Sequence, residues 1–247
     1  QDKLDWQLKL KPMESLRFFN SFFKKSNFIL ISRSEQNFFL KKDIKSLSLF
    51  LKLSVSLGSK NERPTLKIFA PKYQPLPNTE IFSDYLIEQC RRLLISRTGL
   101  TIILLDDQQF RSKLAACLAS DFGTRVLNES MILKTNSVIF SSYAWWLNAQ
   151  SQLPSPDQII IALLPIPSLR SSEVAARVDL LKEQGLDWFR DFLLPEALQL
   201  MPSVVDPLRD RKGRFAILDG RLRARSWGSD FLKVLEPWES LDSLVPD

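Results

Sequence analysis

The chain has 247 residues, 45% of them hydrophobic and 25% charged, which is enough apolar material for one large or two modest cores. It contains no histidine and two cysteines, Cys90 and Cys117, which form no CxxC pair. This excludes a Cys/His zinc site, a four-cysteine iron–sulfur cluster and any triad built on histidine. We therefore expect no structural metal or Fe–S cluster in this segment, and both cysteines in the core.

The net charge of +6 is unevenly distributed. Residues 1–75 hold 15 Lys or Arg against 6 acidic residues, whereas the remainder holds 19 against 22. Such a basic segment favours polyanions, nucleic acid first, and a solvated lysine-rich surface is the alternative. No stretch approaches 18 uninterrupted apolar residues, and residues 1–15 lack a signal peptide's apolar core. We therefore expect a cytoplasmic protein with no membrane partner.

The seven glycines fall in neither a GxxxxGK[ST] nor a GxGxxG pattern. A P-loop needs glycine so that backbone N–H groups can wrap the phosphates. The chain alone therefore has no Walker A site, and any ATP that it contacts has to be presented by another domain.

Residues 1–60 alternate basic and aromatic clusters such as LRFFNSFFKK and NFFLKK. We predict a buried strand at Phe28–Ile31 and a helix over residues 44–58. Interleaved Phe and Lys also suit a face that binds single-stranded nucleic acid, with rings on bases and lysines on phosphates. Core packing is the alternative for these phenylalanines.

From residue 61 onward, helix and strand patterns alternate. The apolar runs are of the kind that a parallel sheet buries on both faces, so we predict an α/β fold with one doubly wound parallel sheet and helices on both faces. A helix capped by Asn78 or Thr79 and another over residues 172–184 lie between strands. The predicted strands are Leu66–Phe69, Leu100–Leu105, Arg125–Leu127, Val138–Phe140, Ile159–Leu164 and Phe215–Leu218.

The stretch Trp188–Pro237 predicts a binding site. It reads as a helix, a basic loop, the strand Phe215–Leu218, an arginine-rich turn and a closing helix. Ligands of open α/β sheets bind at the carboxyl ends of strands, and seven Lys or Arg lie between Arg209 and Arg225. Guanidinium groups bind phosphate bidentately, so phosphate is the expected ligand. The alternative is a solvated turn in which these cations pair with the acids Asp206, Asp210 and Asp219.

Several stretches resemble the second motor domain of DinG/XPD-type superfamily 2 DNA helicases. They are KIFAPKYQPLPNTEIF, GLTIILLDD, IALLPIPS with RVDLLKEQGLDWFRDFLLPEA, and ILDGRL with WGSDFLKVLEP, in the family's order over about residues 66–237. The resemblance implies a RecA-like, P-loop-NTPase-type sheet that lacks Walker A. It implies domain boundaries at 1–60, a remnant of the preceding helicase domain, and 61–247, the C-terminal helicase domain.

The family's arginine motif, Q-x-x-GRLIR, reaches the ATP phosphates. In this chain VDP replaces the glycine and first arginine, and Arg209 is the match to the second arginine. The resemblance implies that Arg209 is catalytic. Other arginines then bind the nucleotide phosphates: Arg211, Arg214 and Arg221.

A second family motif, G-S-F-W-E-G-V-D, touches the sugar–phosphate backbone. At its place stands SSYAWWLNAQ, in which Trp146 matches the tryptophan while Leu and Asn replace Glu and Gly. The resemblance assigns a nucleic-acid contact to Trp146, for which core packing is the alternative. In the arginine-rich turn, Arg223 and Arg225 are the candidates for contacts to the nucleic-acid backbone. Asp106 and Asp107 replace a Thr-Ser pair that faces nucleic acid; we interpret one as a helix cap rather than as an acid/base or Mg²⁺ pair.

We therefore predict the C-terminal domain of a DinG/XPD-like ATP-dependent DNA helicase acting in DNA repair. Its partners would be single-stranded DNA and the N-terminal helicase domain of the same polypeptide. That domain would hold ATP and Mg²⁺, and we expect this chain alone to bind neither. This chain would add an arginine to the interdomain ATP site. The family also has a Ser-Ala-Thr motif, of which Ser32, Arg33 and Ser34 keep only the first position. This departure and those at WLN and VDP support a second hypothesis, a non-catalytic binding or scaffold module. A third is nucleic-acid binding by the basic N-terminal third without ATP.

Overall fold

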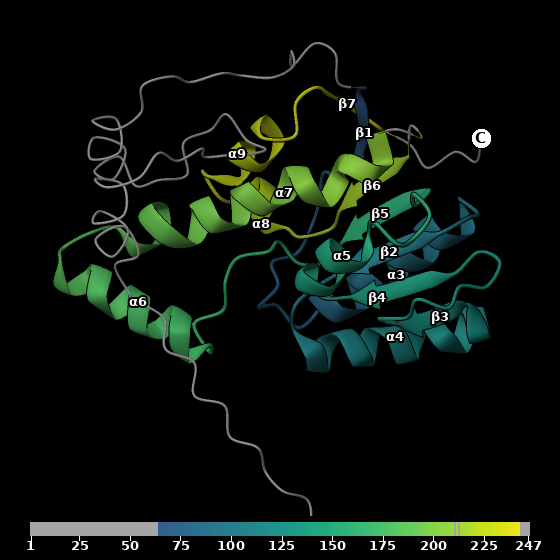
Figure 1. Ribbon diagram of the computed structural model, residues 1–247, viewed down its shortest axis with the longest axis horizontal. Helices are drawn as coiled ribbons and strands as arrows, with labels where there is room; N and C mark the ends of the chain where they lie inside the picture. The colour runs from purple at the N-terminus through teal and green to yellow at the C-terminus, as the bar shows by residue number, and fades with distance from the viewer. Residues whose placement is uncertain (1–63, 210, 212, 243–247) are drawn as a thin grey trace, which may run out of the picture. The chain divides into compact units, whose positions relative to one another are not determined.

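The computed structural model describes residues 64–209, 211 and 213–242 (Figure 1). The predicted strand at Phe28–Ile31 and the predicted helix over 44–58 lie outside the described residues, as do Asp210 and Lys212. The chain divides into two compact units. In one, the described residues are Ser168–Asp191. In the other they are 64–167 together with those from Phe192 onward, and this second unit holds the sheet. The predicted boundary at residue 60 falls in the undescribed part and stays a prediction.

Seven strands of the described chain form one all-parallel sheet in the order β3-β4-β2-β5-β6-β1-β7. The three strands that the sequence places in its centre lie side by side, with Ile103 paired to Ile160 and Ile160 to Ala216. The predicted parallel, doubly wound sheet is therefore confirmed. The strands are β1 (Leu66–Phe69), β2 (Thr101–Leu104), β3 (Val126–Asn128), β4 (Val138–Ser141), β5 (Gln158–Ile161), β6 (Arg214–Ile217) and β7 (Trp238–Ser240).

The helices of this unit are α3 (Phe82–Ile95), α4 (Gln108–Phe122), the 3₁₀ turn η2 (Gly123–Arg125), α5 (Tyr143–Ala149), α7 (Leu194–Arg209), α8 (Arg221–Ala224) and α9 (Gly228–Lys233). The other unit holds α6 (Ser172–Glu183), and the π-helical turn η3 (Phe189–Leu193) leads into α7.

Helices cover both faces of the sheet (Figure 1). Successive strand residues point to opposite faces, and alternate ones such as Ile103, Phe140 and Ile160 pack in one cluster with the apolar faces of α3 and α4. On the other face α5 contacts α7, and α7 contacts β5 and β6. Both layers are apolar, which explains why the central strands read as continuous hydrophobic runs.

The structure corrects several predicted boundaries. Helix α7 continues through Pro202 and Pro207 to Arg209, so Arg209 ends a helix and does not lie in a loop. Helix α3 begins at Phe82 with Ile81 at the N-cap position and no side-chain cap, so the predicted cap at Asn78 or Thr79 is wrong; the Thr79 hydroxyl donates to the Leu76 carbonyl instead. Strand β7, which pairs with β1, is absent from the prediction.

Of the two cysteines, Cys90 is fully buried in the core, as predicted, and burial raises the pKa of its thiol to about 12. Cys117 is half-buried instead. Among the described residues no helix has the length and apolarity needed to cross a bilayer. The same residues contain no cluster of three or more His, Cys, Asp or Glu side chains suited to a metal ion.

Candidate functional site

The arginines that the sequence predicts as one site lie at opposite ends of the parallel strands. We call the side of the sheet where the strands begin the amino edge and the side where they end the carboxyl edge. Arg209 and Arg214 precede or begin β6, whereas Asp219, Arg221 and Arg223 follow it. Strand β6 has four residues, and a parallel strand rises about 3.3 Å per residue, so roughly 13 Å separate the two groups. One phosphate group cannot contact both.

At the amino edge, Arg209 is a structural residue. Its side chain is 6% exposed and its guanidinium donates hydrogen bonds to three backbone carbonyls. The acceptors are Pro64 at 2.7 Å, Pro237 at 3.0 Å and Leu235 at 2.5 Å. These carbonyls precede β1 and β7, so Arg209 ties the end of α7 to the start of both strands. The guanidinium of the predicted catalytic residue is therefore engaged in hydrogen bonds within the fold.

Arg214 is similarly enclosed. It is 4% exposed, donates Nε–H to Gln158 Oε1 at 2.6 Å and donates from Nη2 to the Leu93 carbonyl at 2.8 Å. These bonds join β6 to β5 and to the last turn of α3. No exposed guanidinium is therefore present at this position to bind phosphate, whereas Arg211, three residues earlier, is exposed.

At the carboxyl edge, Asp219 and Arg221 form a partly buried ion pair. Asp219 is fully buried and accepts the Leu164 N–H at 2.8 Å, while Nη2 of Arg221 reaches Oδ2 at 2.6 Å. The pair fixes the loop after β5 against the start of α8. Arg221 keeps a quarter of its side chain exposed, but its charge is balanced by Asp219.

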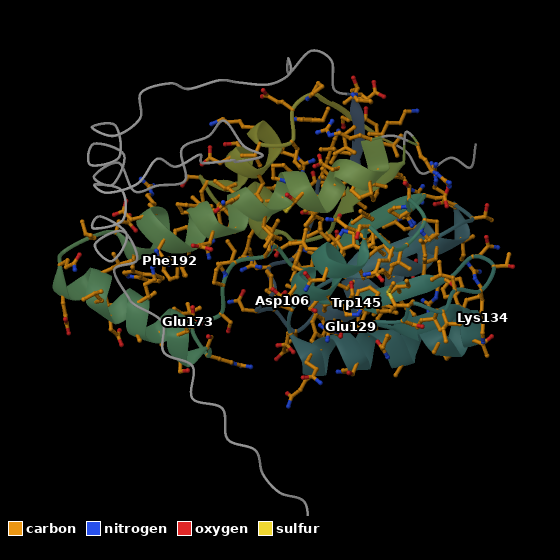
Figure 2. The ribbon with its side chains drawn as sticks, viewed as in Figure 1. Asp106, Glu129, Lys134, Trp145, Glu173 and Phe192 are labelled. Carbon is orange, nitrogen blue, oxygen red and sulfur yellow. The ribbon has the colours of Figure 1, made fainter. Side chains whose placement is uncertain are left out.

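Carboxylates also occupy the ends of β2 and β3, where Figure 2 labels Asp106 and Glu129. Asp106 accepts the Tyr143 N–H at 3.0 Å. Glu129 accepts the N–H and the hydroxyl of Ser142 at 2.9 and 2.7 Å and pairs with Arg111 at 3.3 Å. Glu129 has an unusual φ of 41°, which turns its side chain back onto the start of α5. Two acids therefore hold the N–H groups where α5 begins.

These surroundings shift the two carboxyl groups in opposite directions. Burial raises the pKa of Asp106, outweighing the Tyr143 hydrogen bond and the charge of Arg111. Burial alone would raise the pKa of Glu129 too, but the Ser142 bonds and Arg111 together lower it. A phosphate approaching this part of the edge would meet negative charge, which disfavours binding. Asp107 caps α4 through the Phe110 N–H at 2.8 Å, so the cap interpretation is confirmed.

Trp146 lies in the core. It is 0% exposed, and its indole N–H donates to the Val204 carbonyl of α7 at 3.1 Å. A nucleobase needs a free ring face to stack on, and Trp146 presents none. Packing against α7 is the role that the structure gives it.

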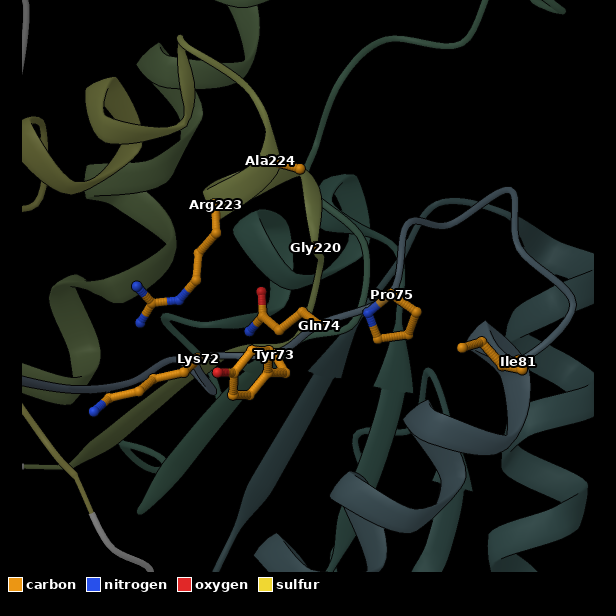
Figure 3. Close-up of a pocket in the computed structure, with 8 residues that line it drawn as sticks. All are labelled: Lys72, Tyr73, Gln74, Pro75, Ile81, Gly220, Arg223 and Ala224. Carbon is orange, nitrogen blue, oxygen red and sulfur yellow. The ribbon is translucent and has the colours of Figure 1, made fainter.

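A shallow hollow of about 460 Å³ opens between the loop after β1 and helix α8 (Figure 3). Its polar lining comes from Lys72, Tyr73, Gln74 and Arg223, and no acidic residue lines it. Tyr73 is 92% exposed. Arg223 is exposed and donates to the carbonyls of Ala70 at 2.6 Å and Pro71 at 2.9 Å. Arg225, at the end of α8, is exposed as well.

Lys72 and Tyr73 are absent from the predicted site. Their signal is the stretch PKYQP directly after the strand Leu66–Phe69, since residues that follow a parallel strand lie at its carboxyl edge. To place these two residues beside Arg223, one has to know that β1 lies next to β6. The local sequence pattern does not indicate the order of the strands.

The sheet is all-parallel and covered by helices on both faces, and the chain resembles DinG/XPD-type DNA helicases. Over 128 residues, 51% of the chain, it is 30% identical to the ATP-dependent DNA helicase YoaA of Haemophilus influenzae. This match confirms the predicted resemblance. The matched part spans 20% of that protein, so the chain covers about a fifth of the length of its curated relative.

Among solved structures, the chain is similar to S. tokodaii Xpd4, with a TM-score of 0.47 and 14% sequence identity. The match covers 78% of this chain and 42% of that one. No family model matches the chain.

Proposed function

We propose that this chain is the second RecA-like lobe of a DinG/XPD-type ATP-dependent DNA helicase and that its own contribution is to bind single-stranded nucleic acid. ATP and Mg²⁺ would be held by a first lobe that carries the P-loop, in the same polypeptide. The observation that carries the proposal is the 128-residue match to a DNA helicase, in a chain with a RecA-like sheet and no glycine-rich phosphate loop.

In such an enzyme the chemistry is phosphoryl transfer to water, which depends on positioned positive charge around the γ-phosphate. A catalytic role for Arg209 requires its guanidinium to leave the carbonyls of Pro64, Leu235 and Pro237. Hydrogen bonds to a charged group contribute about 1.5–3 kcal/mol each. Closure of the two lobes on ATP would have to offset that loss, whereas exposed Arg211 could turn toward a nucleotide without it.

The second candidate is a helicase-like domain that binds or organises partners without catalysis. The observation in its favour is that Arg209, Arg214 and Trp146, three of the residues expected to act on ligands, are at most 6% exposed. Their side chains serve packing and strand attachment, which a domain retains after losing its ligands.

Fluorescence anisotropy of a labelled oligo-dT of about 15 nucleotides, titrated with the chain at about 50 and about 200 mM salt, tests the proposal. We expect saturable binding that weakens as salt rises, because released counterions drive the association. ATP added to the chain alone should show no heat of binding in calorimetry. Absence of oligonucleotide binding at the lower salt concentration would refute the proposed function.

ATP hydrolysis separates the two candidates. When the chain is joined to the P-loop lobe, a working motor hydrolyses ATP faster with single-stranded DNA present, whereas a non-catalytic module gives no DNA-dependent rate. Arg211→Ala and Arg209→Lys then report which arginine the ATP site uses.

A further inference from the structure

The hollow beside α8 combines an exposed aromatic ring with unbalanced positive charge. Tyr73 stands in solvent with 92% of its surface accessible, and single exposed apolar residues need no explanation by themselves. Here, however, the ring shares a concave surface with Lys72 and Arg223, and Figure 3 shows both cationic side chains extending on the same side of the ring. An exposed ring beside cationic side chains is an arrangement by which proteins bind single strands.

The positive charge of the hollow is available to a ligand. Within the described part of the chain, neither Lys72 nor Arg223 forms an ion pair with a carboxylate. The carbonyls of Ala70 and Pro71 that accept from Arg223 carry no net charge, so its +1 charge remains. They also leave one amino group of the guanidinium uncommitted by these two bonds.

The walls of the hollow are held in place before any ligand arrives. Gln74 donates to the Ile217 carbonyl at 2.6 Å, which attaches the loop after β1 to the end of β6. Gly220 lies so close to this loop that a Cβ there would collide with the Pro75 carbonyl oxygen. A preformed surface avoids ordering costs on binding.

We infer that this hollow binds one nucleotide of a single-stranded nucleic acid, with its base stacked on Tyr73 and its flanking phosphates bound by Lys72 and Arg223. The inference rests on the proposed function and gives it a location. It places binding on the side of the carboxyl edge formed by β1 and β6, away from Asp106 and Glu129 at the ends of β2 and β3.

The stacking half is tested with Tyr73→Ala and Tyr73→Phe in the anisotropy titration. Removal of a stacked ring weakens single-strand binding by about tenfold or more, and Phe keeps the ring and should bind as the wild type does. The control is an abasic oligonucleotide of equal length. On it, wild type and Tyr73→Ala should bind equally, because there is no base to stack.

The phosphate half is tested with the double variant Lys72→Ala/Arg223→Ala. The matched control, Arg92→Ala/Lys134→Ala, removes the same charge from two exposed side chains at the amino edge. For single strands, the slope of log affinity against log salt falls by about 0.7 for each phosphate that the protein no longer neutralises. By the same relation we expect a slope reduced by about 1.4 in the first variant and unchanged in the control.

The outcomes separate the site from the proposed function. If the wild type binds oligo-dT and Tyr73→Ala and Lys72→Ala/Arg223→Ala bind equally well, the site is wrong and the function stands. If the two double variants lower the slope equally, binding depends on diffuse charge and the site is again wrong. If the wild type binds no oligonucleotide, both fail.

A folding defect in the double variant would still leave the inference testable. Among the described residues, the side chains of Lys72 and Tyr73 make no hydrogen bond, so the fold does not depend on them in the way that it depends on Arg223. Tyr73→Ala and a single Lys72→Ala therefore remain decisive if removal of Arg223 perturbs folding.

Discussion

The two edges of the sheet use the same residue type in opposite ways. At the amino edge Arg209 and Arg214 are at most 6% exposed, and their guanidinium groups donate to carbonyl and amide oxygens of the chain. At the carboxyl edge Arg223 is exposed and lines an open hollow. All three come from one arginine-rich stretch. The number of arginines in a segment therefore does not measure the positive charge that a ligand meets.

The carboxyl edge is itself divided. Near β2, β3 and β4, Asp106 and Glu129 occupy the start of α5, and near β1 and β6 the hollow presents Lys72 and Arg223 without an acid in its lining. A charged phosphate favours the second region by simple electrostatics. The differences between these regions can be tested by substitution.

The largest expected effect concerns the amino edge. Arg209→Met should lower the free energy of unfolding by about 3 kcal/mol or more, because it removes three hydrogen bonds from a charged donor and leaves the carbonyls of Pro64 and Leu235 without it, while the Pro237 carbonyl keeps the Leu66 N–H. Urea unfolding followed by circular dichroism measures this. Arg211→Met, an exposed arginine two residues away, is the matched control and should change stability by no more than about 0.5 kcal/mol.

Equal stability of Arg209→Met and the wild type would contradict the structural role. Loss of DNA-dependent ATP hydrolysis in a variant of unchanged stability would restore Arg209 to the catalytic role that its position in the sequence implies. The comparison between the two edges would then lose its basis.

Much of the fold is predictable because the central strands are apolar on both faces. The runs in question are of the kind that a covered parallel sheet buries on both faces: Leu100–Leu105, Ile159–Leu164 and Phe215–Leu218. Strand β7 carries no such signal, because WES is short and partly exposed at the sheet margin. Helix α7 also exceeds its predicted end, since the burial of its last apolar residues overrides two prolines.

The site is less predictable, because charge in a sequence says nothing about burial. In the sequence, Arg209 and Arg214 have the features of ligand-binding residues. In the fold, their guanidinium groups donate to carbonyls that are distant in sequence, those of Pro64, Pro237 and Leu93. The capping role of Asp107, in contrast, is local and follows from the helix that begins after it. What depends on neighbours in sequence can be predicted, and what depends on strand order cannot.

An effect of intermediate size is expected at the carboxyl edge, where Gly220 contacts the loop after β1. Gly220→Ala should lower the free energy of unfolding by about 1–3 kcal/mol, because the new Cβ would collide with the backbone oxygens of Gln74 and Pro75, which cannot rotate away. Thermal unfolding measures the loss, and oligo-dT affinity should fall with it as the hollow opens. Ala224→Ser, an exposed change in the same lining, should alter neither. A Gly220→Ala protein of wild-type stability and affinity would show that the close approach of the two loops is dispensable.

The smallest effect distinguishes the two acids of the carboxyl edge. Because the pKa of Asp106 is raised, its charged form is disfavoured by folding at neutral pH, so Asp106→Asn should raise Tm at about pH 7 by on the order of 1 °C. The gain should vanish below about pH 4, where the carboxyl is protonated in both folded and unfolded chains. Glu129→Gln should act oppositely, since the lowered pKa of Glu129 contributes stability at neutral pH that is lost as pH falls through it. Shifts of the same sign in both variants would mean that the acids share one environment, and the binding preference for the side of β1 and β6 would have no electrostatic cause.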